Sequence, residues 1–368
     1  MSEYPFAIWM TDCSEYSDYS EYSDYSEYSD YSEYSDQTVI PNLYFTIGIL
    51  FSLSVGPIIP RFCVSLQKKE KGMTTGRTIM LALLLTMTAC SQTRHASDGD
   101  TEEKAYTLVG RHEVAGRQGV AYENDFYYVS GSTSLTKYDR DWNVVAENTS
   151  PFAEGYVHEV NHIGDIDVCC GELYCGVELF LDGVASNIQM AVYDCETLKL
   201  KRTFDFAPES GQTECSGIAV DAESGTLWMC AWPDEETGRY LYRYDLQSGA
   251  YLGRVRLSKP VKWIQGVACH EGACYLTADD GDADRNEPDH VYKAVWSEDS
   301  TTFLVTEEKS LDDVVLQGEI ECLTFDHARR QMHVLYNRGA RIILGMPSGF
   351  YPGYDHEIHE VFTYDIKK

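Results

Sequence analysis

The residues best suited to chemistry precede short strand-like segments that recur along the chain. They carry carboxylate, amide or imidazole groups and are Gln118, His162 with Asp165, Glu214, Gln265, and Glu319 with Glu321. Calcium in proteins takes six to eight oxygen ligands in flexible geometry. If the strands converge, we expect a calcium site with the metal ligands Asp165, Glu214, Glu319 and Glu321. The alternative is that these side chains only satisfy strand amides or solvate a channel.

The segment from His158 to Asp165 is the densest polar cluster of this part of the chain. A histidine beside a carboxylate can act as a general base near neutral pH. The sequence therefore offers His162 and Asp165 as catalytic residues, with Gln118, His158, Glu214 and Gln265 as binding residues beside them. The alternative is that the two histidines form a hydrogen-bonding scaffold.

The elements that must position these residues are β-strands in a repeated pattern. Each copy has a polar and a small or acidic residue, then alternating apolar residues, a turn and a second short apolar strand; the copies begin at Gln118, Gly164, Ser216, Gln265 and Glu321. These starts lie roughly 46 to 56 residues apart, the length of four antiparallel strands with their turns. Nothing after residue 106 shows comparable helical periodicity.

This repeat predicts an all-β fold, a five-bladed β-propeller, because single four-stranded blades cannot bury both faces alone. Six blades are possible if residues 337–360 hold a poorly marked one. The segment from Tyr106 to Val109 precedes the first inner strand, and the segment from Val361 to Asp365 resembles a third strand. We expect the N-terminal segment to supply the outer strand of the last blade, which removes an exposed edge.

The N-terminal third has a different character. Residues 14–36 repeat a six-residue unit whose only large side chain is Tyr, which predicts disorder. An apolar run over residues 39–60 follows, broken by glycines and prolines. We expect residues 1–72 to be either translated upstream DNA, absent from the native protein, or an extension that the native protein does not require.

From Met73 the chain carries a positive charge at Arg77, an apolar stretch, and the sequence Met87-Thr88-Ala89-Cys90. It resembles a bacterial lipoprotein signal peptide with its lipobox, although Met87 stands where that family prefers Leu. The resemblance implies a signal peptide over residues 73–89, lipidation of Cys90, a flexible linker over residues 90–105, and a propeller domain over residues 106–368. It also implies export to the bacterial cell envelope. Ser91 favours the outer membrane in a diderm source.

The charge of the chain excludes some partners. The formal net charge is -30, and without residues 1–72 there are 59 − 11 = 48 acidic against 29 − 4 = 25 basic residues, a net charge of -23. Such a field repels nucleic acid and anionic lipid headgroups and favours cations or basic partners. We expect a small-molecule, glycan or protein ligand, no nucleic acid, and membrane contact through the lipid anchor only.

Nine cysteines follow Cys90, and an odd number cannot all pair within one chain. Cys269 and Cys274 flank a tight turn and are expected to face each other across a hairpin. Most of the others lie in apolar strand patterns, which favours buried free thiols. No CxxC pair is present, so we expect no structural zinc.

The predicted architecture resembles a broad group of bacterial propellers that includes gluconolactonase-like, strictosidine-synthase-like and esterase-like or phytase-like proteins. The sequence from Glu319 to Thr324 looks like the Glu-x-Glu-Gly-Leu phrase of the esterase-like group, with Cys322 in place of glycine. Members of the group use a central calcium for hydrolysis. The gluconolactonase set of one Glu, two Asn and one Asp is not found at matching positions.

Three functions follow from these observations. The first is a lipid-anchored binding or interaction protein of the cell envelope, with a ligand, and calcium as its possible cofactor, at an acidic channel mouth. The second is a calcium-dependent hydrolase of lactones, esters or phosphate esters centred on His162 and Asp165. The third is a structural module of a surface assembly, because a propeller alone does not imply a function.

Overall fold

The computed structural model describes residues 105–153, 155–233 and 236–367. The predicted extension, signal peptide, lipidated Cys90 and nearly all of the linker lie outside these residues. No helix within the described part has the length and hydropathy that a membrane span requires.

The described residues form small antiparallel sheets, which confirms the predicted all-β fold. One sheet has the order β2-β3-β4-β5, with bounds Gly119–Glu123, Phe126–Gly131, Ser134–Asp139 and Val144–Asn148. Another has the order β6-β7-β8-β9, with bounds His162–Cys169, Glu172–Leu181, Val184–Asp194 and Leu200–Asp205. Two 3-10 helices, η1 and η2, cover Pro208–Ser210 and Thr237–Arg239.

An eight-stranded sheet joins two further four-stranded groups where β13 and β17 pair briefly in parallel. The group β10 to β13 covers Gly217–Asp221, Thr226–Cys230, Tyr240–Asp245 and Tyr251–Leu257. The group β14 to β17 covers Ile264–His270, Ala273–Ala278, His290–Trp296 and Thr302–Ser310. The last sheet has the order β1-β22-β19-β18, with bounds Tyr106–Glu113, Ile358–Ile366, Gln331–Arg338 and Gln317–Asp326.

Tight turns fix the register of several hairpins. Cys170 and Gly171 between β6 and β7 both have positive φ, as do Glu271 and Gly272 between β14 and β15. Two-residue turns of this kind match the right-handed twist of the paired strands. The second turn places Cys269 directly opposite Cys274, which confirms the expected pairing of these two residues.

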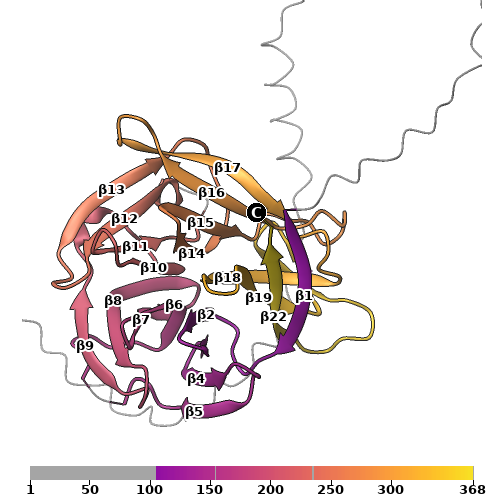
Figure 1. Ribbon diagram of the computed structural model, residues 1–368, viewed down its shortest axis with the longest axis horizontal. Coiled ribbons are helices and arrows are strands. Elements are labelled where there is room, and N and C mark those ends of the chain that lie inside the picture. The colour runs from indigo at the N-terminus through magenta and orange to yellow at the C-terminus, as the bar shows by residue number, and fades with distance from the viewer. Residues whose placement is uncertain (1–104, 154, 234–235, 368) are drawn as a thin grey trace, which may run out of the picture. The chain divides into compact units, whose positions relative to one another are not determined.

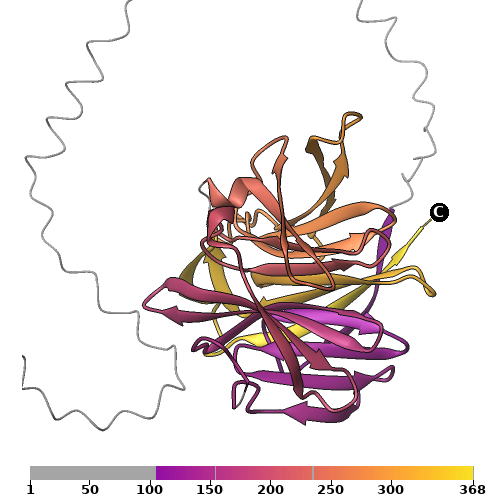
Figure 2. The ribbon, with the colours of Figure 1, turned by 90° about the vertical axis from the view of Figure 1, so that its left-hand side faces the viewer.

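The four-stranded groups are arranged around a common axis. Figure 1 shows β2, β6, β10, β14 and β18 near the centre and β1, β5, β9, β13 and β17 at the periphery. Each inner strand contacts the next, and β18 contacts β2, so the ring is closed. Buried apolar side chains fill the space between successive groups, and Figure 2 shows the groups from the side.

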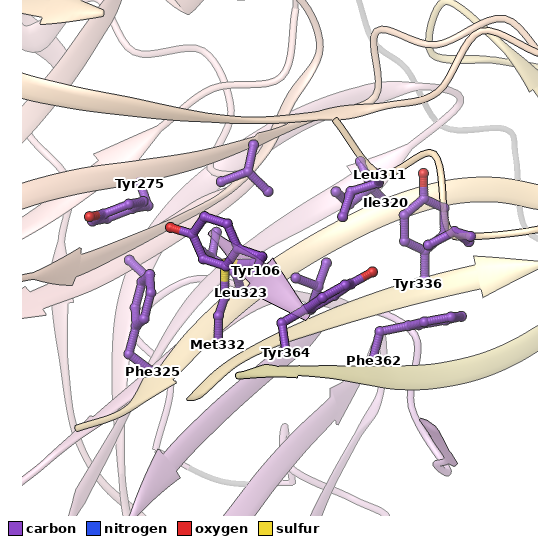
Figure 3. Close-up of a cluster of buried hydrophobic side chains, with 14 of the residues drawn as sticks. Tyr106, Tyr275, Leu311, Ile320, Leu323, Phe325, Met332, Tyr336, Phe362 and Tyr364 are labelled. Carbon is purple, nitrogen blue, oxygen red and sulfur yellow. The ribbon is translucent and has the colours of Figure 1, made fainter. Parts of the chain in front are cut away.

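The ring is closed by the two ends of the described chain. β1 pairs with β22 from Tyr106, opposite Ile366, to Glu113, opposite Glu360. This confirms the prediction that the N-terminal segment forms the outer strand of the last group. Tyr106 packs in one cluster with Tyr275 and Phe325 (Figure 3). Strand β1 therefore contributes to the hydrophobic core as well as covering an edge.

Residues 337–360, which the sequence offered as a sixth blade, contain the end of β19, a hairpin and the start of β22. The hairpin consists of β20, Ala340–Ile343, and β21, Met346–Phe350. Its turn folds towards the loop after β15, where the Leu344 N–H donates to the Gly281 carbonyl at 2.9 Å.

Candidate binding site at the mouth of the central axis

The inner strands approach one another closely at Gly119, Asp165, Gly217, Gly266 and Cys322. A Cβ atom at Gly217 would lie 2.9 Å from the Val267 nitrogen, and one at Gly266 would lie 2.6 Å from the Cys322 Cα. Glycine is thus required for the close approach of the strands. The side chains of Asp165 and Cys322 occupy the space that remains.

Asp165 holds several inner strands together. Its Oδ1 accepts the Ile166 N–H at 2.7 Å, and its Oδ2 accepts the N–H groups of Ile218 and Val267, both at 3.3 Å. The residue is 1% exposed, and this burial raises the pKa of its carboxyl well above the usual value. Asp165 is therefore a buried structural acceptor on the axis, whereas the sequence suggested a catalytic or metal-binding residue.

His162 lies at the start of β6 beside a different carboxylate. Its Nδ1 is 3.4 Å from Oε1 of Glu178 in β7, and these two buried atoms have no hydrogen-bond partner among the described residues. The other Glu178 oxygen accepts the Cys215 N–H at 3.1 Å. Glu214 accepts the Trp232 N–H at 2.7 Å. Burial, and then the nearby charge of Glu178, raise the pKa of Glu214.

Arg117 precedes β2 and lies among three carboxylates. Its guanidinium is 2.6 Å from Glu319, 3.1 Å from Glu357 and 3.7 Å from Glu321. Gln265 donates to Glu319 at 2.5 Å. Burial disfavours the charged form of Arg117, but the three carboxylates more than offset this, so its pKa is raised. We call the end of the central axis at which the inner strands begin the mouth. Arg117 supplies a positive charge there.

Asp279 and Asp289 add two buried carboxyl groups to this part of the structure, and Asp279 lies close enough to Glu319 and Glu321 to feel their charge. Asp279 follows β15 and is 1% exposed, and its Oδ2 has no partner in the described structure. Burial, and then the charge of Asp289, raise the pKa of Asp279 well above the usual value. Burial is also the main cause that raises the pKa of Asp289 to about 7. Together with the three carboxylates around Arg117, these groups outnumber the one arginine.

Two tryptophans connect the acidic groups of the mouth. The Trp232 and Trp263 rings lie 4.5 Å apart between centroids, and both residues are half-buried. The backbone N–H of Trp232 donates a hydrogen bond to the Glu214 carboxylate. The backbone carbonyl of Trp263 accepts one from the Asp279 N–H at 2.9 Å. Both tryptophans are thus hydrogen-bonded through their backbones to acidic residues, Glu214 and Asp279, and tryptophan rings in such a position attract organic cations.

The structure does not bring all predicted site residues together. His158 is exposed, and its Nε2 lies 3.7 Å from Asp205 at the end of the outer strand β9. It lines a separate hollow of about 300 Å³ with residues of the segment 152–160. Gln118 is half-buried next to Arg117, and its N–H donates to the Ser130 carbonyl at 2.9 Å. His158 is therefore not part of the mouth.

The residues predicted to bind calcium do not fit that ion in the arrangement observed. Asp165 accepts backbone N–H groups, Glu214 lies by Trp232, and Glu319 and Glu321 face Arg117. No three His, Cys, Asp or Glu side chains in the described part converge as metal ligands. Calcium needs more oxygen ligands at shorter distance than this set provides.

The sequence reasoning missed Arg117, Glu178, Asp279, Asp289 and Glu357. Arg117 and Asp279 had a detectable signal, because each lies next to a predicted strand at the end where the inner strands begin. Glu178 lies opposite His162 in the hairpin register, which its position along β7 would have suggested. Asp289 and Glu357 come from a loop and from the segment after β21, and no repeat marks them.

Comparison with known proteins finds similarity of architecture alone. No protein-family model and no curated protein sequence matches the chain. A gluconolactonase from Xanthomonas campestris is 14% identical with a TM-score of 0.38, over 65% of this chain and 68% of that one. Hydrazine synthase of Kuenenia stuttgartiensis is 11% identical with a TM-score of 0.38, over 68% and 63%. The Pan2 WD40 domain of Neurospora crassa is 9% identical with a TM-score of 0.35, over 68% and 63%.

Proposed function

We propose that the protein is a five-bladed propeller, lipid-anchored in the cell envelope, that binds a small organic cation at the mouth of its central axis. Each four-stranded group is one blade, and the ligand carries an ammonium, quaternary ammonium or guanidinium group. The anchor at Cys90 and the export follow from the lipobox resemblance.

The observation that carries this proposal is the surplus of carboxylates in the mouth. Arg117 faces Glu319, Glu321 and Glu357, while one oxygen of Asp279 has no partner among the described residues. Buried carboxylates without compensating charge are held protonated, at a cost in free energy. A cation in their midst would let them ionise and would gain attraction in a poorly solvated site.

The indoles of Trp232 and Trp263 favour an organic cation over a metal ion. Aromatic faces attract alkylammonium and guanidinium groups, and tryptophan does so most strongly. Metal ions instead require several converging ligand atoms. The acidic net charge of the chain also favours a positively charged ligand, because it raises the local concentration of cations.

Isothermal titration calorimetry of the full chain tests this function, with choline and spermidine as cationic probes and glycerol as the neutral one. We expect saturable binding of at least one cation and none of glycerol. Asp279→Asn should weaken binding about tenfold or more, since losing one charge contact costs about 1.4 kcal/mol or more. Glu223→Gln removes an exposed charge from the turn between β10 and β11, at the other end of the inner strands, and should leave affinity unchanged.

The pairing of His162 with Glu178 supports a second candidate, a hydrolase of lactones, esters or phosphate esters. Glu178 would orient the imidazole, and His162 would act as the general base. Asp165, which the sequence suggested as the carboxylate beside His162, instead accepts hydrogen bonds from backbone N–H groups. Hydrolysis of p-nitrophenyl acetate, butyrolactone and p-nitrophenyl phosphate, abolished in His162→Ala, would favour this candidate, and equal rates in both proteins would reject it.

A further inference from the structure

Cys169 and Cys170 form a dithiol in the turn between β6 and β7, at the end of the inner strand that lies away from the mouth. Their sulfur atoms lie 3.2 Å apart. Cys170 is exposed and Cys169 is half-buried, whereas most other cysteines of the described part are buried. This pair is therefore the most accessible pair of thiols in the described structure.

The turn is held rigidly from the neighbouring blade. Glu123 in β2 accepts the Cys170 N–H at 2.6 Å and the Gly171 N–H at 3.0 Å. The Gly171 carbonyl accepts the Cys195 N–H at 3.1 Å. Because both sides of the turn are fixed, the two thiols are kept close together in the reduced protein.

We propose that Cys169 and Cys170 form a reversible vicinal disulfide by exchange with a small-molecule disulfide. The Cys170 thiolate attacks one sulfur of the disulfide and displaces the first thiolate, which gives a mixed disulfide on Cys170. The Cys169 thiolate then attacks the Cys170 sulfur, displaces the second thiolate and closes the ring. The protein loses two protons and two electrons, and the small disulfide is reduced to two thiols.

The order of these steps follows from exposure and charge. Cys170 is open to solvent and reacts first. Burial, and then the contact with Cys170, raise the pKa of Cys169 to about 12, so it does not compete for the first attack. Once the mixed disulfide has formed, proximity favours the second step, because intramolecular attack has a high effective concentration.

Geometry indicates a switch rather than a permanent crosslink. Adjacent Cα atoms across a trans peptide lie about 3.8 Å apart, closer than the roughly 4.4–6.8 Å of ordinary disulfides. The ring is therefore strained and easily reduced. Cys269 and Cys274 provide an internal comparison, with sulfur atoms 4.0 Å apart and Cys274 buried.

The test is to incubate the reduced full chain with glutathione disulfide and follow it by mass spectrometry and thiol counting. We expect the loss of two thiols at Cys169 and Cys170 with no glutathione retained, and recovery of both thiols with reduced glutathione. Cys169→Ser should retain one glutathione on Cys170. Cys170→Ser should lose the fast reaction, while the matched Cys269→Ser should keep it.

Two results would overturn the proposal. One is a parent protein that keeps a stable glutathione adduct on Cys170, because the second step then fails. The other is an unchanged rate of thiol loss in Cys170→Ser. Thermal unfolding of each variant shows whether it is folded, and we expect Cys170→Ser to melt like the parent because the side chain is exposed.

Discussion

Asp165 in β6 accepts the backbone N–H of Val267 in β14 at 3.3 Å, although β10 lies between these two strands in the ring. One carboxylate thus spans the axis and joins inner strands of three blades. The centre of the propeller is filled at this level, and the polar mouth lies on one side of it.

Asp165→Ala should destabilise the protein strongly. It leaves the N–H groups of Ile166, Ile218 and Val267 without their acceptor, and each unsatisfied buried donor costs about 1–3 kcal/mol. We expect a loss of about 3 kcal/mol or more in the free energy of unfolding, measured by urea denaturation. A variant as stable as the parent would show that Asp165 does not hold the strands.

Gly266→Ala should also be destabilising, because its Cβ would lie 2.6 Å from the Cys322 Cα. Overpacking of this kind costs about 1–3 kcal/mol. The matched control is Gly110→Ala in β1, where the nearest atoms are 3.5 Å or more away. Equal melting temperatures for the two variants would argue against a tightly packed axis.

Arg117→Gln should lower the free energy of unfolding by about 2 kcal/mol. This lies between the cost of breaking an exposed ion pair and that of breaking a buried one. The substitution leaves Glu319, Glu321 and Glu357 without their counter-ion, so the pKa values of Glu319 and Glu321, which burial already raises, should rise further. Since a raised carboxyl pKa stabilises the fold only at low pH, the loss should be larger at pH 8 than at pH 5. Arg285→Gln, an exposed residue near Asp282, serves as control.

The stability of the parent should fall as the pH rises from about 4 to about 7. Asp289 has a pKa of about 7 in the folded protein, above the value of an unfolded Asp, so its contribution is complete at low pH and is lost as the carboxyl ionises. One such group gives a slope of at most about 1.4 kcal/mol per pH unit. Asp289→Asn should reduce that slope in denaturation curves recorded across this range, and an unchanged slope would exclude Asp289 as its source.

Chelation should leave the melting temperature unchanged. Arg117 supplies positive charge among the carboxylates that the sequence suggested as calcium ligands. Thermal unfolding with excess EDTA, followed by added calcium, measures this directly. If EDTA lowers the melting temperature and added calcium restores it, these residues rearrange around the ion, and the calcium site predicted from the sequence would be supported.

The sequence predicted the fold better than the site. The spacing of the segments after Gln118, Ser216 and Gln265 follows from local strand and turn chemistry. The inner strands, and the closure of the ring by β1, could therefore be predicted from the sequence. The partners of Asp165 could not, because they depend on which blades face each other across the axis. Glu178 lies 16 residues from His162 in sequence but opposite it in the hairpin register, and Arg117 meets Glu319 only when the ring closes.

The central claim is that the carboxylates of the mouth take an organic cation, and a crystal structure of the full chain grown with choline at pH 8 tests it most directly. The account predicts density for the quaternary ammonium group against Trp232 or Trp263 and within contact distance of Asp279 or Glu319. An empty mouth in crystals that hold saturating choline, with Arg117 and the carboxylates arranged as described, would contradict it.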